Sequence, residues 1–136
     1  MQITSFFKED NMEPALILRT STVLLAIAAG GGLVMAGIRF ATDRQPPPAL
    51  AMLHGFLAGA AVTLLLYASA TVGLPNMAVG ALVLFMAAAA GGVILNLNYH
   101  WKQLPLPKWL IGVHATAAVA GFLLLLATTW VTPLAE

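Results

Sequence analysis

Four long apolar stretches constrain the fold of this 136-residue chain more than any other feature. They cover residues 15–41, 48–72, 77–99 and 108–131. Each stretch reaches the roughly 20 residues that a helix needs to cross a bilayer. The chain is 60% hydrophobic and 8% charged, whereas a soluble domain has about 25% charged residues. We therefore predict an integral membrane protein, with residues 1–14 as an extramembrane tail and 15–136 as the transmembrane domain.

The three breaks between these stretches are short, and each contains proline. They read TDRQPPP (42–48), GLPN (73–76) and HWKQLPLP (100–107). Proline suits a loop or the first turn of a helix, because it has no backbone N–H to donate. Connections this short make neighbouring helices antiparallel. The predicted fold is an all-α, up-down four-helix transmembrane bundle.

The lysines and arginines are distributed unevenly between the two predicted membrane faces. Arg39 and Arg44 lie at the first break and Lys102 and Lys108 at the third. The opposite face has Lys8 and Arg19. Because positive residues favour the cytoplasmic side, we expect the first and third loops in the cytoplasm and both termini outside, in a bacterial inner (cytoplasmic) membrane. The net charge of +1 offers no footprint for a nucleic-acid partner.

The chain also contains an internal repeat with an offset of 60 residues. Residues 22–67 placed on 82–127 give 14 identities in 46 positions without a gap. The matches that composition explains least are Gly31–Gly32 with Gly91–Gly92, Pro47 with Pro107, and His54 with His114. The predicted repeat halves are 15–73 and 77–131. Since each half contains two spans, we expect a pseudo-twofold axis along the membrane normal.

His54 and His114 are the main candidate site residues, because a histidine inside a span is costly to bury. Each lies six residues into its stretch, so both lie about 9 Å from equivalent helix ends. Their helices are diagonal in the bundle, and neighbouring axes are roughly 8–10 Å apart, so we expect the two side chains not to touch. They can hold a flat metal macrocycle between them, as axial ligands of the iron in one haem b. Without cysteine, the haem would be bound non-covalently.

Two further groups of residues could complete such a site. The pairs Gly31–Gly32 and Gly91–Gly92 lie near the depth of the histidines and would let a macrocycle edge approach the backbone. The alternative is that these glycines serve close helix packing. Arg39 and Arg44 lie at the end suited to haem propionates, although cytoplasmic positive residues need no such role.

Asn96, Asn98, Tyr99 and His100 form a polar cluster at the end of the third stretch. A quinone headgroup near Asn98 and His100 could use these donors, as could a partner subunit, and a plain surface is the other alternative. Phe40 stands opposite His100 in the repeat, so a second bis-histidine haem is not expected. All five acids lie in tails or loops, which argues against an ion-coupled transporter. No nucleophile–base pair is visible, so we expect a non-catalytic subunit.

The motifs L-H-x-x-x-A (53–58) and V-H-x-x-x-A (113–118), with the glycine pairs, give the chain a resemblance to small four-helix membrane b-type cytochromes. These include cytochrome b561-like proteins and the haem anchors of succinate dehydrogenase and related quinone-linked complexes. One haem-binding half of a haem A synthase is similar in layout. The chain departs from the first family by having one matched histidine pair, and from the last by lacking acids in its spans. The resemblance implies an electron-transfer subunit of a larger membrane redox complex linked to the quinone pool.

Other functions remain compatible with the same residues. The chain could be a cofactor-free scaffold or assembly subunit of a redox or photosynthetic complex. It could also be a pigment-binding subunit, in which each histidine binds its own chlorophyll-type macrocycle. A proton relay or a purely structural role for the histidines is a further alternative.

Overall fold

The computed structural model describes residues 12–131, and this part of the chain forms four long helices without a strand. They are α2 (Met12–Thr42), α3 (Pro48–Thr71), α4 (Asn76–Ile94) and α5 (Lys108–Val131), with the short π-helix η1 (Leu95–His100) continuing α4. All four are long and apolar enough to cross a membrane. The predicted all-α four-helix bundle is therefore confirmed.

The helix ends follow the proline signals closely. Pro47 and Pro75 directly precede α3 and α4, and each occupies the position before the first helical turn. The carbonyl of Pro47 accepts from the N–H groups of the third and fourth residues after it, and Pro107 does the same before α5. The first helix begins at Met12, inside the predicted tail, and the rest of that tail lies outside the described residues.

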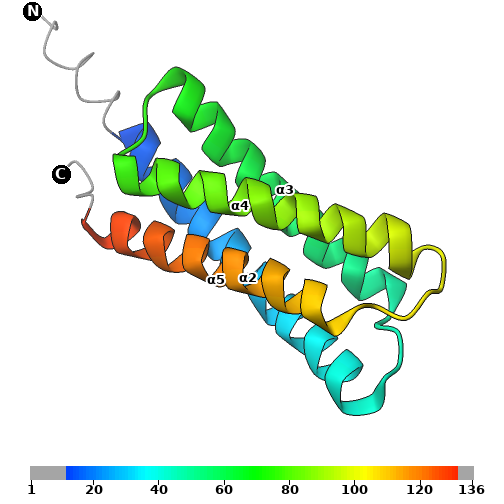
Figure 1. Cartoon of the computed structure of the whole chain (residues 1–136). Coiled ribbons are helices and arrows are strands. Elements are labelled where there is room, and N and C mark those ends of the chain that lie inside the picture. The colour runs from blue at the N-terminus through cyan, green and yellow to red at the C-terminus, as the bar shows by residue number, and fades with distance from the viewer. Residues whose placement is uncertain (1–11, 132–136) are drawn as a thin grey trace, which may run out of the picture.

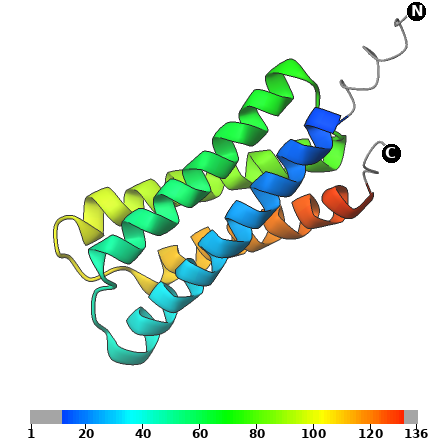
Figure 2. The same cartoon turned by 180° about the vertical axis from the view of Figure 1, so that it is seen from behind.

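The helices pair as two antiparallel hairpins, α2 with α3 and α4 with α5 (Figure 1). The α2–α3 loop and the loop that leads into α5 lie side by side at one end of the bundle (Figure 2). The α3–α4 turn lies at the other end, where Gly73 adopts a φ of 78°. The connectivity is therefore up-down-up-down, and the repeat halves correspond to the two hairpins.

The tightest packing lies in the half of the bundle near the α3–α4 turn. The buried apolar cluster there consists of Leu18, Leu25, Ala61, Leu65, Ala78, Ala81, Leu82, Phe85 and Leu125. Its members follow the repeat, since Leu65 matches Leu125 and Leu25 matches Phe85. Large apolar side chains also cover the outside of the bundle, with Leu33 72% exposed and Phe56 71% exposed. Such an outer surface fits direct contact with lipid tails.

The π-helix η1 breaks the symmetry of the two hairpins. The equivalent residues 35–40 of α2 stay α-helical, whereas 95–100 form the wider helix. Short π segments within α-helices are often found at functional sites. Nothing in the sequence pattern predicted this change. His100, the last residue of η1, is buried at the loop end.

Candidate cofactor site at the paired histidines

The structure brings His54 of α3 and His114 of α5 together inside the bundle. The centres of the two imidazole rings are 6.1 Å apart, and the ring planes are inclined by 69°. The rings are closer than the sequence argument predicted, because both side chains lean from diagonal helices toward each other. The two hairpins thus contribute one imidazole each to a shared position.

Each histidine is oriented by a carbonyl of the other helix in its own hairpin. Nδ1 of His54 lies 2.8 Å from the carbonyl oxygen of Ala28, and Nδ1 of His114 lies 2.7 Å from that of Ala88. A carbonyl can only accept, so both Nδ1 atoms carry the proton and donate it. Both Nε2 atoms then keep a free lone pair, and within residues 12–131 neither forms a hydrogen bond. Metal-bound histidines are commonly held in this way.

The glycine pairs lie directly against the histidine side chains. A Cβ atom on Gly32 would lie 3.1 Å from Cε1 of His54, and one on Gly92 would lie 3.2 Å from Cε1 of His114. A Cβ atom added to Gly31 would lie 3.9 Å from the Cβ of His54, and one added to Gly91 would lie 3.6 Å from the Cβ of His114. The glycines therefore leave room for the imidazoles themselves, while the predicted approach of a macrocycle edge to them stays a prediction.

The layer of the bundle around the histidines is less buried than the rest of the described chain. No side chain is buried in residues 29–38, 48–60, 89–99 or 111–120. His54 and His114 are both half-buried. The apolar cluster closes one side of this layer, and the buried residues Arg39, His100, Leu106 and Leu110 close the other. The layer around the histidines therefore lies between two ends of the bundle that contain buried side chains.

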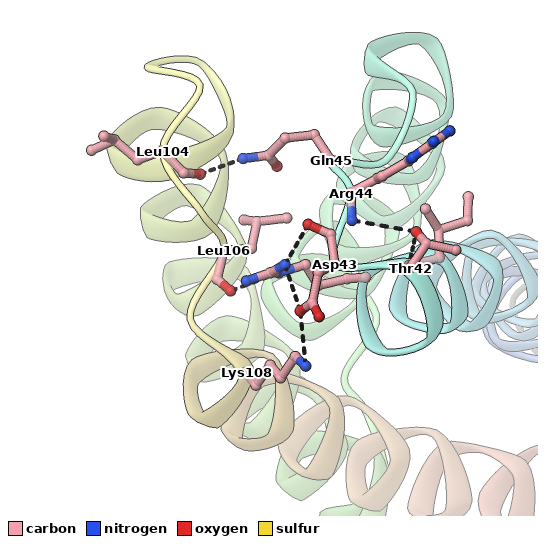
Figure 3. A network of polar contacts seen from close by, with 9 residues as sticks. Thr42, Asp43, Arg44, Gln45, Leu104, Leu106 and Lys108 are labelled. Atoms are coloured by element: carbon pink, nitrogen blue, oxygen red, sulfur yellow. Dashed lines mark hydrogen bonds and ion pairs between the residues drawn. The ribbon is translucent and has the colours of Figure 1, made fainter.

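At the end of the bundle nearer to the histidines, a polar network joins the α2–α3 loop to the loop that leads into α5 (Figure 3). We call this contact the loop junction. Arg39 donates from Nε to the Leu106 carbonyl at 3.0 Å and from Nη1 to Oδ1 of Asp43 at 3.1 Å. Lys108 Nζ lies 3.0 Å from the same oxygen. The hydrogen bond and positive charge of Lys108, with the charge of Arg39, hold the pKa of Asp43 below its usual value. Gln45 adds a hydrogen bond from its amide to the Leu104 carbonyl.

Arg39 and Arg44, the two residues predicted to contact haem propionates, differ in their relation to this network. Arg39 is buried and uses Nε and Nη1 to hold the loops together. Arg44 is exposed, and its side chain is directed away from Asp43 and Lys108 (Figure 3). The contact of either arginine with a propionate stays a prediction, and Arg39 has a clear structural role without it.

The structure separates the residues of the predicted quinone site. His100 is buried and donates from Nε2 to the Pro46 carbonyl at 2.9 Å, so it is not a surface residue. Asn98 is exposed on the same π-helix. The two side chains therefore differ in burial, and the quinone contact stays a prediction.

Sequence reasoning missed the groups that orient the site. The Ala28 and Ala88 carbonyls could have been found, because both alanines match in the repeat and each precedes its histidine by 26 residues. Asp43 gave no comparable signal, since a single acid in a polar loop is ordinary. Within the described residues, no group of three or more histidine, aspartate or glutamate side chains could hold a metal ion. The histidine pair can therefore supply two ligands and no more.

No protein-family model, curated protein or solved structure matches this chain. The function is therefore inferred from the geometry and chemistry of the histidine site itself.

Proposed function

We propose that this integral membrane protein is an electron-transfer subunit that holds one haem b between His54 and His114. The observation that carries the proposal is the matched pair of imidazoles, whose centres are 6.1 Å apart and whose Nδ1 atoms both donate to backbone carbonyls. An imidazole–metal bond is about 2.0 Å long, so two imidazoles on opposite sides of one metal place their ring centres about 6 Å apart. The measured separation fits one shared metal.

A macrocycle fits this site better than a bare ion, because the described chain supplies only two ligands. A porphyrin adds four equatorial nitrogens and leaves the two axial positions for histidine. If each histidine bound its own pigment, the two stacked macrocycles would add about 3.5 Å to the separation of the imidazole ring centres. The separation of 6.1 Å therefore favours one haem over a pair of pigments.

When bound, the haem iron would supply reversible one-electron chemistry. His54 and His114 would bind it axially, and the Ala28 and Ala88 carbonyls would fix both imidazoles in the tautomer that binds metal. The apolar cluster toward the α3–α4 turn would exclude water from that side, and a dry environment is one determinant of redox potential. Residues 12–131 offer no further cluster of metal-binding side chains, so electrons would pass to and from other subunits of a membrane redox complex linked to the quinone pool.

The membrane sidedness belongs to the same proposal. Arg39, Arg44, Lys102 and Lys108 all lie at the end where the two loops meet. Their excess favours that end as the cytoplasmic side of a bacterial inner membrane. Because the chain has no cysteine, single cysteines placed at position 44 or 102 can be labelled from either side to test this orientation. Labelling of these cysteines only from outside the cell would establish the opposite orientation.

The reduced-minus-oxidised visible spectrum of the purified full-length protein tests the haem directly. We expect a haem b α-band in the wild type, and its loss in both His54→Ala and His114→Ala. The control is His100→Gln, which removes the remaining histidine of the chain. This variant should keep the band, because the imidazole of His100 bonds to the Pro46 carbonyl at the loop junction and not to the paired histidines.

The main rival is a cofactor-free scaffold or assembly subunit, for which the histidines would only join the helices of each hairpin. A wild-type protein from a haem-replete host that shows no α-band would establish that reading and overturn ours. Retention of the band in either His54→Ala or His114→Ala would also overturn the bis-histidine assignment. A circular dichroism spectrum of each variant separates loss of haem from loss of the helical fold.

A further inference from the structure

A second polar cluster lies at the opposite end of the bundle, between the first turns of α2 and the last turn of α5. Arg19, Thr22, Val23, Thr129 and Trp130 line a cleft of about 450 Å³. This volume is within the range of small-molecule sites in proteins. Nothing in the proposed haem function uses these residues, which lie beyond the apolar cluster from the histidines.

The two threonines explain how the cleft is held in place. Both are buried, and their hydroxyl oxygens lie 2.9 Å apart. Each hydroxyl also lies within hydrogen-bond distance of a carbonyl of its own helix, at 2.7 Å from Leu18 and 2.8 Å from Leu125. Two hydroxyls have only two protons for these three contacts, so neither is left as a donor for a ligand. The groups that remain are the exposed guanidinium of Arg19 and the exposed indole of Trp130.

The charge of Arg19 has no anion to balance it within residues 14–130. The only acid in that range is Asp43, which lies at the other end of the bundle, paired with Arg39 and Lys108. Arg19 is five residues inside the start of the first span at Pro14, or about 7.5 Å along the helix axis. An arginine at that depth extends its guanidinium toward the interface, where lipid phosphates lie.

We propose that this cleft binds the phosphodiester headgroup of one anionic phospholipid. A guanidinium matches two phosphate oxygens in a bidentate geometry. Trp130 adds an indole N–H donor at the membrane interface, where tryptophan is favoured. The lipid phosphate would be the counter-ion that Arg19 lacks within the described span.

A second, shallow and open apolar groove lies farther along α5. Its volume is about 390 Å³, and it is lined by Ala115, Thr116, Val119, Ala120 and Leu123. Thr116, Leu123 and Trp130 are spaced by seven residues, so they lie on one face of the helix. One leaflet is about 15 Å thick, which is about ten residues of helix. An acyl chain that starts beside Trp130 would therefore lie along this groove as far as Ala120.

Native mass spectrometry of the full-length protein tests the site, with phosphatidylglycerol and phosphatidylcholine of identical acyl chains supplied in equal amounts. We expect the wild type to retain one phosphatidylglycerol in preference to phosphatidylcholine. Arg19→Gln should reduce that retention by about tenfold, as loss of a charge-assisted hydrogen bond predicts. Arg19→Lys, which keeps the charge, should retain part of the preference. The control Arg44→Gln removes an exposed arginine at the opposite end and should leave it unchanged.

Equal retention of the two lipids by the wild type would overturn the proposal, as would an Arg19→Gln variant that keeps its preference for phosphatidylglycerol. Release of the bound lipid by excess inorganic phosphate would identify a free-anion site and would also overturn it. The helical circular dichroism signal of each variant verifies the fold. The outcome does not depend on haem, so the experiment can be repeated on His54→Ala with the same expectation.

Discussion

The two halves of this bundle are built from the same four helices but are packed differently. In the half toward the α3–α4 turn, which we call the closed half, Leu65 and Leu125 are fully buried in one apolar cluster. Toward the loop junction, the repeat-matched His54 and His114 are only half-buried, and their layer contains no fully buried side chain. The contrast teaches that the first half holds the helices together by apolar burial, while the second half contains the paired histidines at which we propose haem binding. Four variants break or sharpen this comparison.

The largest effect is expected from Leu125→Ala in the closed half. Leu125 is fully buried, so truncation leaves a cavity and should lower the stability by about 2–5 kcal/mol. The measurement is the midpoint of thermal unfolding in a fixed detergent. Leu123→Ala is the control on the same helix, because Leu123 is 58% exposed and should have little effect. Equal losses in the two variants would mean that the closed half is not the stabilising one.

Gly32→Ala should act on the layer around the two histidines and leave the closed half intact. The new methyl group would lie 3.1 Å from Cε1 of His54, so the imidazole must move by a few tenths of an ångström. Displacing a metal-bound histidine in this way typically weakens binding by about tenfold or more. The ratio of haem to protein and the α-band report it.

Gly30→Ala is the matched control for this glycine, since nothing lies within 4 Å of a Cβ atom at Gly30. It should keep the haem content of the wild type. If Gly30→Ala and Gly32→Ala lose haem equally, close packing against His54 is not the cause.

Thr22→Val tests the hydroxyl contact that joins α2 to α5 beyond the closed half. Hydrogen bonds between membrane helices contribute about 0.6 kcal/mol on average, so a small decrease in stability is expected. Thr63→Val is the control, because the Thr63 hydroxyl bonds only to a carbonyl of its own helix. A decrease of the same size in Thr63→Val would remove the special role of the Thr22–Thr129 pair. The midpoint of thermal unfolding, recorded at low and at high detergent concentration, measures the stability of both variants.

The smallest effect is expected from Asp43→Asn at the loop junction. The pKa of Asp43 is lowered from about 3.8 by Lys108 and Arg39. The carboxylate therefore stabilises the junction at pH values above 3.8, and this contribution is lost as the pH falls through the lowered pKa. Wild type should unfold at a slightly higher temperature than Asp43→Asn at neutral pH, and the two unfolding temperatures should converge as the pH falls through the lowered pKa of Asp43. A difference that grows in acid would contradict the network.

Much of this architecture follows from particular sequence signals. Pro47 and Pro107 place the starts of two helices, because proline ends one element and begins the next. The offset of 60 residues between His54 and His114 predicts two equivalent positions at one depth. The π-helix Leu95–His100 was not predictable, because hydropathy and proline signals do not distinguish an α-helix from a π-helix. The sequence left the surroundings of His100 open between a quinone site, a partner contact and a plain surface, because its burial depends on the Pro46 carbonyl of a distant loop.

The sequence by itself determined the four spans, their antiparallel order and the pairing of the histidines, because hydropathy, proline and the repeat all act along the chain. Only the tertiary structure decided how the histidines are used. It set their ring centres 6.1 Å apart, and it set the Ala28 and Ala88 carbonyls against their Nδ1 atoms. It also assigned Arg39 to the loops. Such contacts depend on how helices tilt and pack against one another, which short-range patterns do not specify.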